Sequence, residues 1–167
     1  EALAEAEEVL DSAFSSDVLS ADVASLRGAS AVVADDDPKI RAAFERALAE
    51  VGVSVHLVDD GSKVLDVVRQ VSPDFIVADL LMPGMDGWTL CRRLRSDYAL
   101  RHIPVILLSR KEHVLARKGG LRVDADDCML KEADGRQIAA RVAHVLRPRF
   151  VLARQLGIMG DVGGRIE

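Results

Sequence analysis

The sequence contains few of the residues and segments that mark secreted or membrane proteins. Only two of its 167 residues are cysteine, and only 4% are aromatic. No apolar run approaches the roughly 20 residues that a membrane-spanning helix needs, and no stretch resembles a signal peptide. We therefore expect a cytoplasmic protein with an aliphatic core, no membrane segment, and reduced thiols rather than a disulfide at Cys91 and Cys128.

Positive charge is missing from the first part of the chain. Positions 1 to 26 hold seven acidic residues and no lysine or arginine, whereas the whole chain has a net charge of -5. The remainder is close to neutral, so it gives no sign of a surface for nucleic acid. Within positions 1 to 26, apolar residues recur at helical spacing, at Leu3, Ala6, Leu10, Ala13 and Phe14. We interpret residues 1–29 as an amphipathic linker helix, with a frayed terminus as the alternative.

Apolar runs of strand length alternate with helical patterns between residues 30 and 148. The predicted strands cover residues 31–34, 53–58, 75–78, 103–108 and 127–130, and the predicted helices cover residues 38–51, 63–71, 87–96, about 112–121 and about 135–146. This alternation is typical of βαβ units, and it predicts an α/β protein with a parallel sheet.

Capping and helix-breaking residues set the limits of several predicted helices. Asp37 is placed to cap the first helix, Pro38 occupies its first turn, and Gly52 follows its end. Pro148 is predicted to stop the last helix, because proline lacks the backbone N–H that a helix interior needs. We therefore expect residues 149–167 to form a connector toward a further output domain.

Carboxylates follow two of the predicted strands. Asp79 comes directly after one apolar strand, and Asp35, Asp36 and Asp37 come directly after another. In a parallel sheet these ends face the same edge, where open α/β folds place their ligands. Three or four carboxylates gathered there need a cation, and a set of oxygen donors without histidine or cysteine suits Mg²⁺. Asp37 alone is better explained as a helix cap.

Four landmarks stand in order between Ala31 and Arg147. They are the run Asp35-Asp36-Asp37-Pro38, the segment Asp79-Leu80-Leu81-Met82-Pro83-Gly84, the strand Ile103-Pro104-Val105-Ile106 leading to Ser109, and Ala125-Asp126-Asp127 before Lys131. Each landmark alone is weak, but together, at these spacings, they are highly specific. The sequence resembles the receiver domain of two-component response regulators.

The resemblance implies a fold, a reaction and partners. The fold is a doubly wound, flavodoxin-like α/β domain over residues 30–148, with five parallel strands in the order 2-1-3-4-5. The reaction is transfer of a phosphoryl group to Asp79 from a histidine kinase or phosphotransfer protein. Beyond slow self-catalysed phosphotransfer and dephosphorylation, we do not expect an enzyme. The implied partners are that kinase and an output domain or protein, with a second copy of the chain as a further candidate.

The resemblance also implies a role for each residue of the site. Asp36 and Asp79 would bind Mg²⁺ directly, together with the backbone carbonyl of Leu81, and Asp35 would hold a metal-bound water. Lys131 and Ser109 would contact the phosphoryl group. Taken alone, Lys131 would be interpreted as a solvated surface cation and Ser109 as a hydroxyl at the end of a strand. Only their combination with the carboxylates favours a functional role for either residue.

Three residues depart from the family pattern. Arg110 follows Ser109, where the family has a small residue, and Cys128 replaces the aromatic residue that turns inward on phosphorylation. Glu132 replaces a proline after Lys131, so we expect a trans peptide bond there. These departures favour an alternative function, a pseudo-receiver that binds proteins without phosphate. A metal-assisted phosphate-ester hydrolase is a distant third hypothesis.

Overall fold

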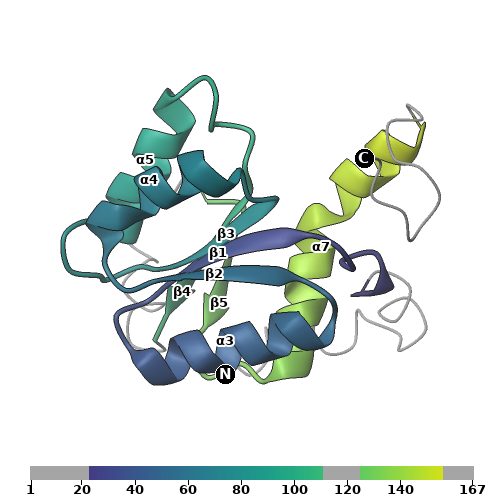
Figure 1. Ribbon diagram of the computed structural model, residues 1–167, viewed down its shortest axis with the longest axis horizontal. Coiled ribbons are helices and arrows are strands. Elements are labelled where there is room, and N and C mark those ends of the chain that lie inside the picture. The colour runs from purple at the N-terminus through teal and green to yellow at the C-terminus, as the bar shows by residue number, and fades with distance from the viewer. Residues whose placement is uncertain (1–22, 111–124, 156–167) are drawn as a thin grey trace, which may run out of the picture.

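A five-stranded parallel sheet forms the centre of the molecule (Figure 1). The computed structural model describes residues 23–110 and 125–155, with residues 148–155 as backbone alone. The strands are Ser30–Ala34 (β1), Ser54–Val58 (β2), Phe75–Asp79 (β3), Val105–Ser109 (β4) and Asp127–Leu130 (β5). Their spatial order is β2-β1-β3-β4-β5, which confirms the predicted topology.

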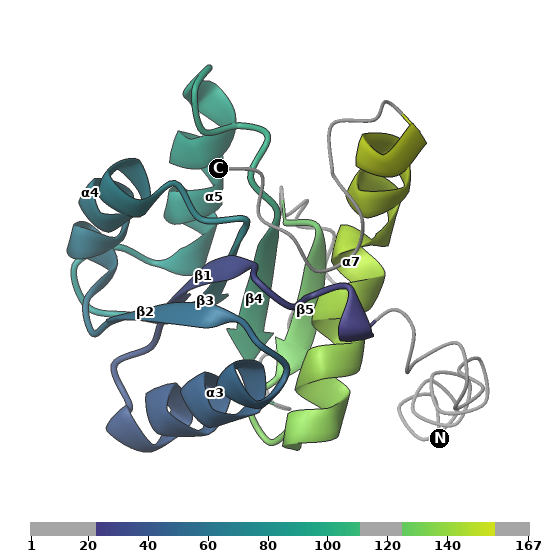
Figure 2. The ribbon, with the colours of Figure 1, turned by 45° about the vertical axis from the view of Figure 1, so that its right-hand side comes forward.

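Helices cover both faces of the sheet. The helices are Pro38–Glu50 (α3), Gly61–Val71 (α4), Gly87–Ser96 (α5) and Gly135–Gln155 (α7). Figure 2 shows α4 and α5 on one face and α3 and α7 on the other. Alternate residues of one strand serve opposite faces, so Val33 packs beneath α3 and α7 while Val32 packs beneath α4 and α5. Two covered faces explain why the central strands are continuously apolar.

Helix α3 forms as the sequence predicts. The carboxylate of Asp37 accepts a hydrogen bond from the N–H of Lys39 at 2.9 Å, and Pro38 stands in the first turn. Phe44 and Leu48, one turn apart, are fully buried against the sheet. Gly52 ends the segment with a φ of 87°, a left-handed conformation that glycine adopts at little cost.

Two elements begin two residues away from the predicted position, and a side-chain hydrogen bond lies at each of these starts. Helix α4 begins at Gly61, two residues early, because the carboxylate of Asp60 accepts the N–H of Ser62 at 2.7 Å and so caps the helix there. Strand β4 begins at Val105 rather than at Ile103, whose carbonyl accepts a hydrogen bond from Arg95 at 2.9 Å.

The prediction that the last helix ends at Pro148 is wrong. Helix α7 continues through this residue to Gln155. Proline removes one backbone hydrogen bond and clashes with the preceding turn, at a cost of about 3 kcal/mol, and this usually kinks a helix rather than dissolving it. Ile138, Val142 and Leu146 anchor the first part in the core, so the helix that reaches the proline is already nucleated. Figure 1 shows the helix changing direction toward its yellow end.

Several predicted features lie outside the described residues. These are the helix over about 112–121, residues 1–22 of the linker helix, and residues 156–167 of the connector. Of the linker, Leu26 is fully buried in the core beneath α3 and α7, with Val23 packed against the same cluster. Within the described ranges, no helix is both long and apolar enough to span a membrane.

Candidate functional site

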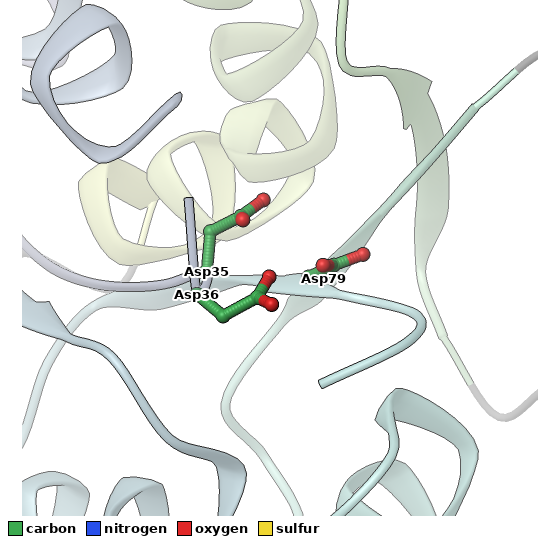
Figure 3. A group of neighbouring side chains, drawn as sticks. All are labelled: Asp35, Asp36 and Asp79. Carbon is green, nitrogen blue, oxygen red and sulfur yellow. The ribbon is translucent and has the colours of Figure 1, made fainter. Parts of the chain in front are cut away.

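The carboxyl ends of β1 and β3 bring three carboxylates together. Ala34 of β1 pairs with Ala78 of β3, so Asp35 and Asp36 leave one strand beside the point where Asp79 ends the other. Oxygen atoms of the three carboxylates all lie within 4.8 Å of one another. Figure 3 shows the side chains of Asp35 and Asp36 next to that of Asp79. The predicted acidic cluster is therefore present.

Lys131 enters the cluster from the end of β5, which is separated from β3 by β4. Its ammonium nitrogen lies 2.7 Å from Oδ2 of Asp79 and 3.0 Å from Oδ2 of Asp35. All three side chains are almost completely buried, whereas Asp36 is exposed. The N–H of Lys131 donates to the carbonyl of Ser109 at 3.0 Å, which fixes the backbone of the lysine against β4. The structure thus places one cation between two buried carboxylates.

The charges of the site are not balanced. Among the described residues, three carboxylates gather around the ammonium of Lys131, so the carboxylates outnumber the cation that contacts them. Burial raises the pKa of the Asp35 carboxyl, although the N–H of Asp37 and the ammonium of Lys131 oppose the shift. Burial alone would lower the pKa of Lys131, but its contacts with Asp79 and Asp35 outweigh this effect and raise it. The lysine therefore stays charged, and the site favours a further cation.

The loop after Asp79 is held against the neighbouring helix. Oδ1 of Asp79 accepts the N–H of Leu81 at 3.2 Å, and the carbonyl of Pro83 accepts the N–H of Gly61 at the start of α4. A Cβ atom at Gly87 would lie 2.9 Å from the carbonyl oxygen of Asp79, so only glycine fits there. Leu81 is 47% exposed. The loop is thus fixed while its side chain at residue 81 faces solvent.

Ser109 lies at the same edge but does not bond Asp79. The residue is 2% exposed at the end of β4, and its hydroxyl makes a long hydrogen bond, 3.4 Å, with the carbonyl of Arg110. The side chain of Arg110 is exposed. The structure therefore brings Ser109 to the site without giving its hydroxyl a short contact there.

The three departures are visible in the structure. Cys128 is half-buried in β5, against the core beneath α4 and α5, and no disulfide joins it to the fully buried Cys91. Both cysteines are therefore reduced thiols, as the sequence predicts. The peptide bond between Lys131 and Glu132 is trans, as predicted.

No sequence pattern indicated one further residue at the site, Arg41 of α3. Its Nη1 atom donates a hydrogen bond to the carbonyl of Asp35 at 2.7 Å.

Comparisons with known proteins agree with this geometry. The family model described as "Response regulator receiver domain" matches residues 31–143. The chain belongs to this family. The family is one of signalling proteins of two-component systems, so the resemblance found in the sequence is confirmed.

Curated relatives of this receiver domain are longer response regulators. Response regulator MprA of Mycolicibacterium vanbaalenii is 36% identical over 70% of this chain and 49% of its own length. The DNA-binding response regulator MtrA of Mycolicibacterium smegmatis is 33% identical over 78% of this chain and 56% of its own length. The chain therefore spans about half the length of these relatives.

Solved structures share the fold. A putative response regulator from Chloroflexus aurantiacus is 27% identical, with a TM-score of 0.66 over 71% of this chain and 98% of that one. The receiver domain of a signal transduction histidine kinase from Syntrophus aciditrophicus is 31% identical, with a TM-score of 0.62 over 72% and 92%. Both likenesses confirm the flavodoxin-like receiver fold.

Proposed function

We propose that this receiver domain accepts a phosphoryl group on Asp79 from a histidine kinase or phosphotransfer protein. The observation that carries the proposal is the ammonium of Lys131, held 2.7 Å from Asp79 and 3.0 Å from Asp35, with all three side chains almost completely buried. A carboxylate is a useful nucleophile toward a phosphate only where nearby cations offset both charges. Lys131 is such a cation.

The residues of the site suit a hard divalent cation such as Mg²⁺. Asp36, Asp79 and the carbonyl of Leu81 would hold it directly, and Asp35 would hold a water of its shell. All of these donors are oxygen atoms, as Mg²⁺ prefers. Oδ2 of Asp35 is buried and accepts no hydrogen bond of good geometry, so it still needs a partner besides the ammonium of Lys131. The bound ion would neutralise the excess carboxylate charge and polarise the phosphoryl oxygens.

In the proposed step, a carboxylate oxygen of Asp79 forms the new bond to phosphorus. The P–N bond of the donor phosphohistidine breaks, and its electron pair returns to the imidazole nitrogen. Lys131 pairs with Asp79 before transfer and with a phosphoryl oxygen after it, since its three donors rotate freely. The phosphoryl group on Asp79 would then offer charged oxygens to the hydroxyl of Ser109. A hydrogen bond to one of them would draw this hydroxyl away from the carbonyl of Arg110 and shift the conformation of β4.

Phosphorylation of this domain would regulate an output elsewhere. Residues 149–167 would connect the domain to that output, either within one longer chain or through a partner protein. The relatives support this arrangement, because this chain spans about half their length and one of them is named a DNA-binding response regulator. Outside its first 26 residues the chain is close to neutral, which does not suggest binding of nucleic acid by the domain itself.

The test is a measurement of intact mass after incubation with acetyl phosphate and Mg²⁺. We expect the mass of one phosphoryl group to appear, and we expect neither a chelator-treated sample nor Asp79→Asn to gain it. A wild-type chain that stays unmodified, under conditions that phosphorylate a control receiver, would reject the proposal. That outcome would favour the second candidate, a pseudo-receiver.

The pseudo-receiver is supported by specific side chains. Arg110 directly follows Ser109 with an exposed guanidinium, where the family has a small residue. Cys128 cannot make the inward rotation of an aromatic side chain. A pseudo-receiver would keep the fold, and it would bind its partner as tightly after the substitution Asp79→Asn as before it. Partner binding that is independent of the carboxylate at position 79 is therefore its signature.

A further inference from the structure

Arg41 ties the acidic end of β1 to helix α3. Its Nη1 atom donates a hydrogen bond of 2.7 Å to the backbone carbonyl oxygen of Asp35, six residues earlier. Arg41 is half-buried and stands at the end of the first turn of α3, whose cap is Asp37. The guanidinium therefore reaches back over this turn to the first residue after β1.

The bonded carbonyl belongs to the peptide unit that leads into Asp36. This unit is planar, so fixing the carbonyl of Asp35 also fixes the plane in which the nitrogen of Asp36 lies. Neighbouring contacts hold the residues on either side. The N–H of Asp35 donates to the carbonyl of Val58 at 3.1 Å, and the N–H of Asp37 donates to Oδ1 of Asp35 at 2.9 Å. Arg41 completes this frame.

Asp36 depends on that frame more than the other carboxylates do. Asp35 and Asp79 are buried and held by Lys131, whereas Asp36 is exposed and its carboxylate makes no hydrogen bond with the described residues. Its carboxylate nevertheless lies within the cluster of oxygens that spans 4.8 Å. The position of the Asp36 carboxylate in the cluster therefore depends on the conformation of its backbone.

We propose that Arg41 is a positioning residue that directs the Asp36 carboxylate toward the cation of the site. The inference rests on the proposed function, because it takes Asp36 as a metal ligand. Residues that orient metal ligands typically contribute tenfold to a hundredfold in metal affinity.

The charge of Arg41 acts in the opposite direction, and this makes the inference testable. A cation close to the cluster repels Mg²⁺, so removing the charge without disturbing the geometry would strengthen metal binding. Removing the hydrogen bond would weaken it. The sign of the change therefore separates a positioning role from a purely electrostatic one, and a role in stability alone would leave the affinity of the folded protein unchanged.

The experiment is a Mg²⁺ titration of the full chain, followed by NMR through the backbone amides of residues 35–37 and 79–81. Wild type is compared with Arg41→Gln and Arg41→Lys. Arg46→Gln is the matched control, because Arg46 is an exposed arginine further along α3. Thermal unfolding without Mg²⁺ establishes that each variant is folded.

We expect Arg41→Gln to bind Mg²⁺ about tenfold more weakly than wild type. Arg41→Lys keeps the charge and one donor, so its affinity should lie between the two, while Arg46→Gln should match wild type. If Arg41→Gln does not fold, Arg41→Lys decides alone. Either Arg41 variant binding as tightly as wild type, or more tightly, overturns the inference. Absence of binding by wild type would instead reject the metal site of the proposed function.

Discussion

The amino and carboxyl ends of the strands form two opposite edges of the sheet, and these edges use charged side chains in opposite ways. At the amino edge, Arg95 bonds Asp126 at 2.8 Å and also donates to the carbonyls of Arg101 and Ile103. Asp126 accepts the N–H of Val105 as well, at 2.7 Å. Arg95 and Asp126 therefore both have opposite charges or backbone groups as partners. At the carboxyl ends of the strands, within the described part of the chain, three carboxylates lie together and only two of them contact Lys131.

The difference shows where stability and where reactivity reside. At the amino edge, the bonds of Arg95 and Asp126 hold the segments that precede β4 and β5 without a ligand, so these charges stabilise the fold. The carboxyl edge keeps an excess of negative charge and a buried oxygen of Asp35 without a good hydrogen bond. Such incomplete compensation is unfavourable for stability, but it prepares the site for a cation and a phosphoryl group.

The strongest test of this comparison is Asp79→Asn. We expect phosphoryl incorporation to be abolished, because an amide is not a nucleophile toward phosphorus. Thermal stability should change little, since the amide oxygen can still accept from Lys131 and one carboxylate charge is removed. Intact mass and a melting curve on the same sample measure both. A large loss of stability would mean that the carboxyl edge also serves the fold.

Arg95→Ala is the converse change at the amino edge. It removes bonds to one carboxylate and two carbonyls, and we expect it to lower the free energy of unfolding by about 2 kcal/mol. Mg²⁺ affinity and phosphorylation of the folded protein should stay as in wild type. Arg93→Ala, at an exposed position of the same helix, is the control and should change stability by under about 0.5 kcal/mol. Equal effects of the two substitutions would contradict the structural role of Arg95.

Leu81→Asn tests how the carboxyl edge keeps a phosphoryl group. Leu81 is partly exposed, and its backbone N–H contacts Asp79. Its apolar side chain cannot orient an attacking water, whereas an amide can. We expect the phosphorylated protein to lose its phosphoryl group several-fold faster in the variant. A decay time course after removal of the donor measures this. Equal or slower decay would show that Leu81 does not limit the access of water, and Leu81→Met serves as the apolar control.

Asp36→Ala is expected to have the smallest effect, and its sign depends on Mg²⁺. Without the ion, losing one of three crowded carboxylates should stabilise the fold by under about 1 kcal/mol, because this side chain is exposed. With saturating Mg²⁺, wild type should gain stability from the bound ion and the variant should gain less. Melting curves with and without Mg²⁺ check this. The same gain in both proteins would remove Asp36 from the metal site.

Local sequence signals predicted most of the fold and most of the site. Asp79 and the acidic run could be placed because each follows a strand, and the edge they share follows from the parallel topology. Lys131 could be placed by the same argument together with the family resemblance. Each of these signals is a short sequence pattern, and the patterns of successive helices and strands all indicate the same fold.

The parts that the sequence did not predict depend on tertiary contacts. Proline at position 148 is a strong local stop, but core packing through Leu146 outweighed it. Arg41 gave no signal, because a bond from a guanidinium to a backbone carbonyl needs no particular residue at the acceptor. The direction of the Ser109 hydroxyl depends on one torsion, which no pattern records.

The length of α7 determines where this domain can be shortened. The family match ends at residue 143, yet Leu146 is only 2% exposed and belongs to the same core cluster as Phe44. Truncation after residue 143 would remove that leucine, at a cost of about 2–5 kcal/mol, and would leave the carbonyls of a core turn without their partners. Truncation at Pro148 would also cut through a continuous helix. A stable fragment that ends within the described residues should therefore keep α7 through Gln155.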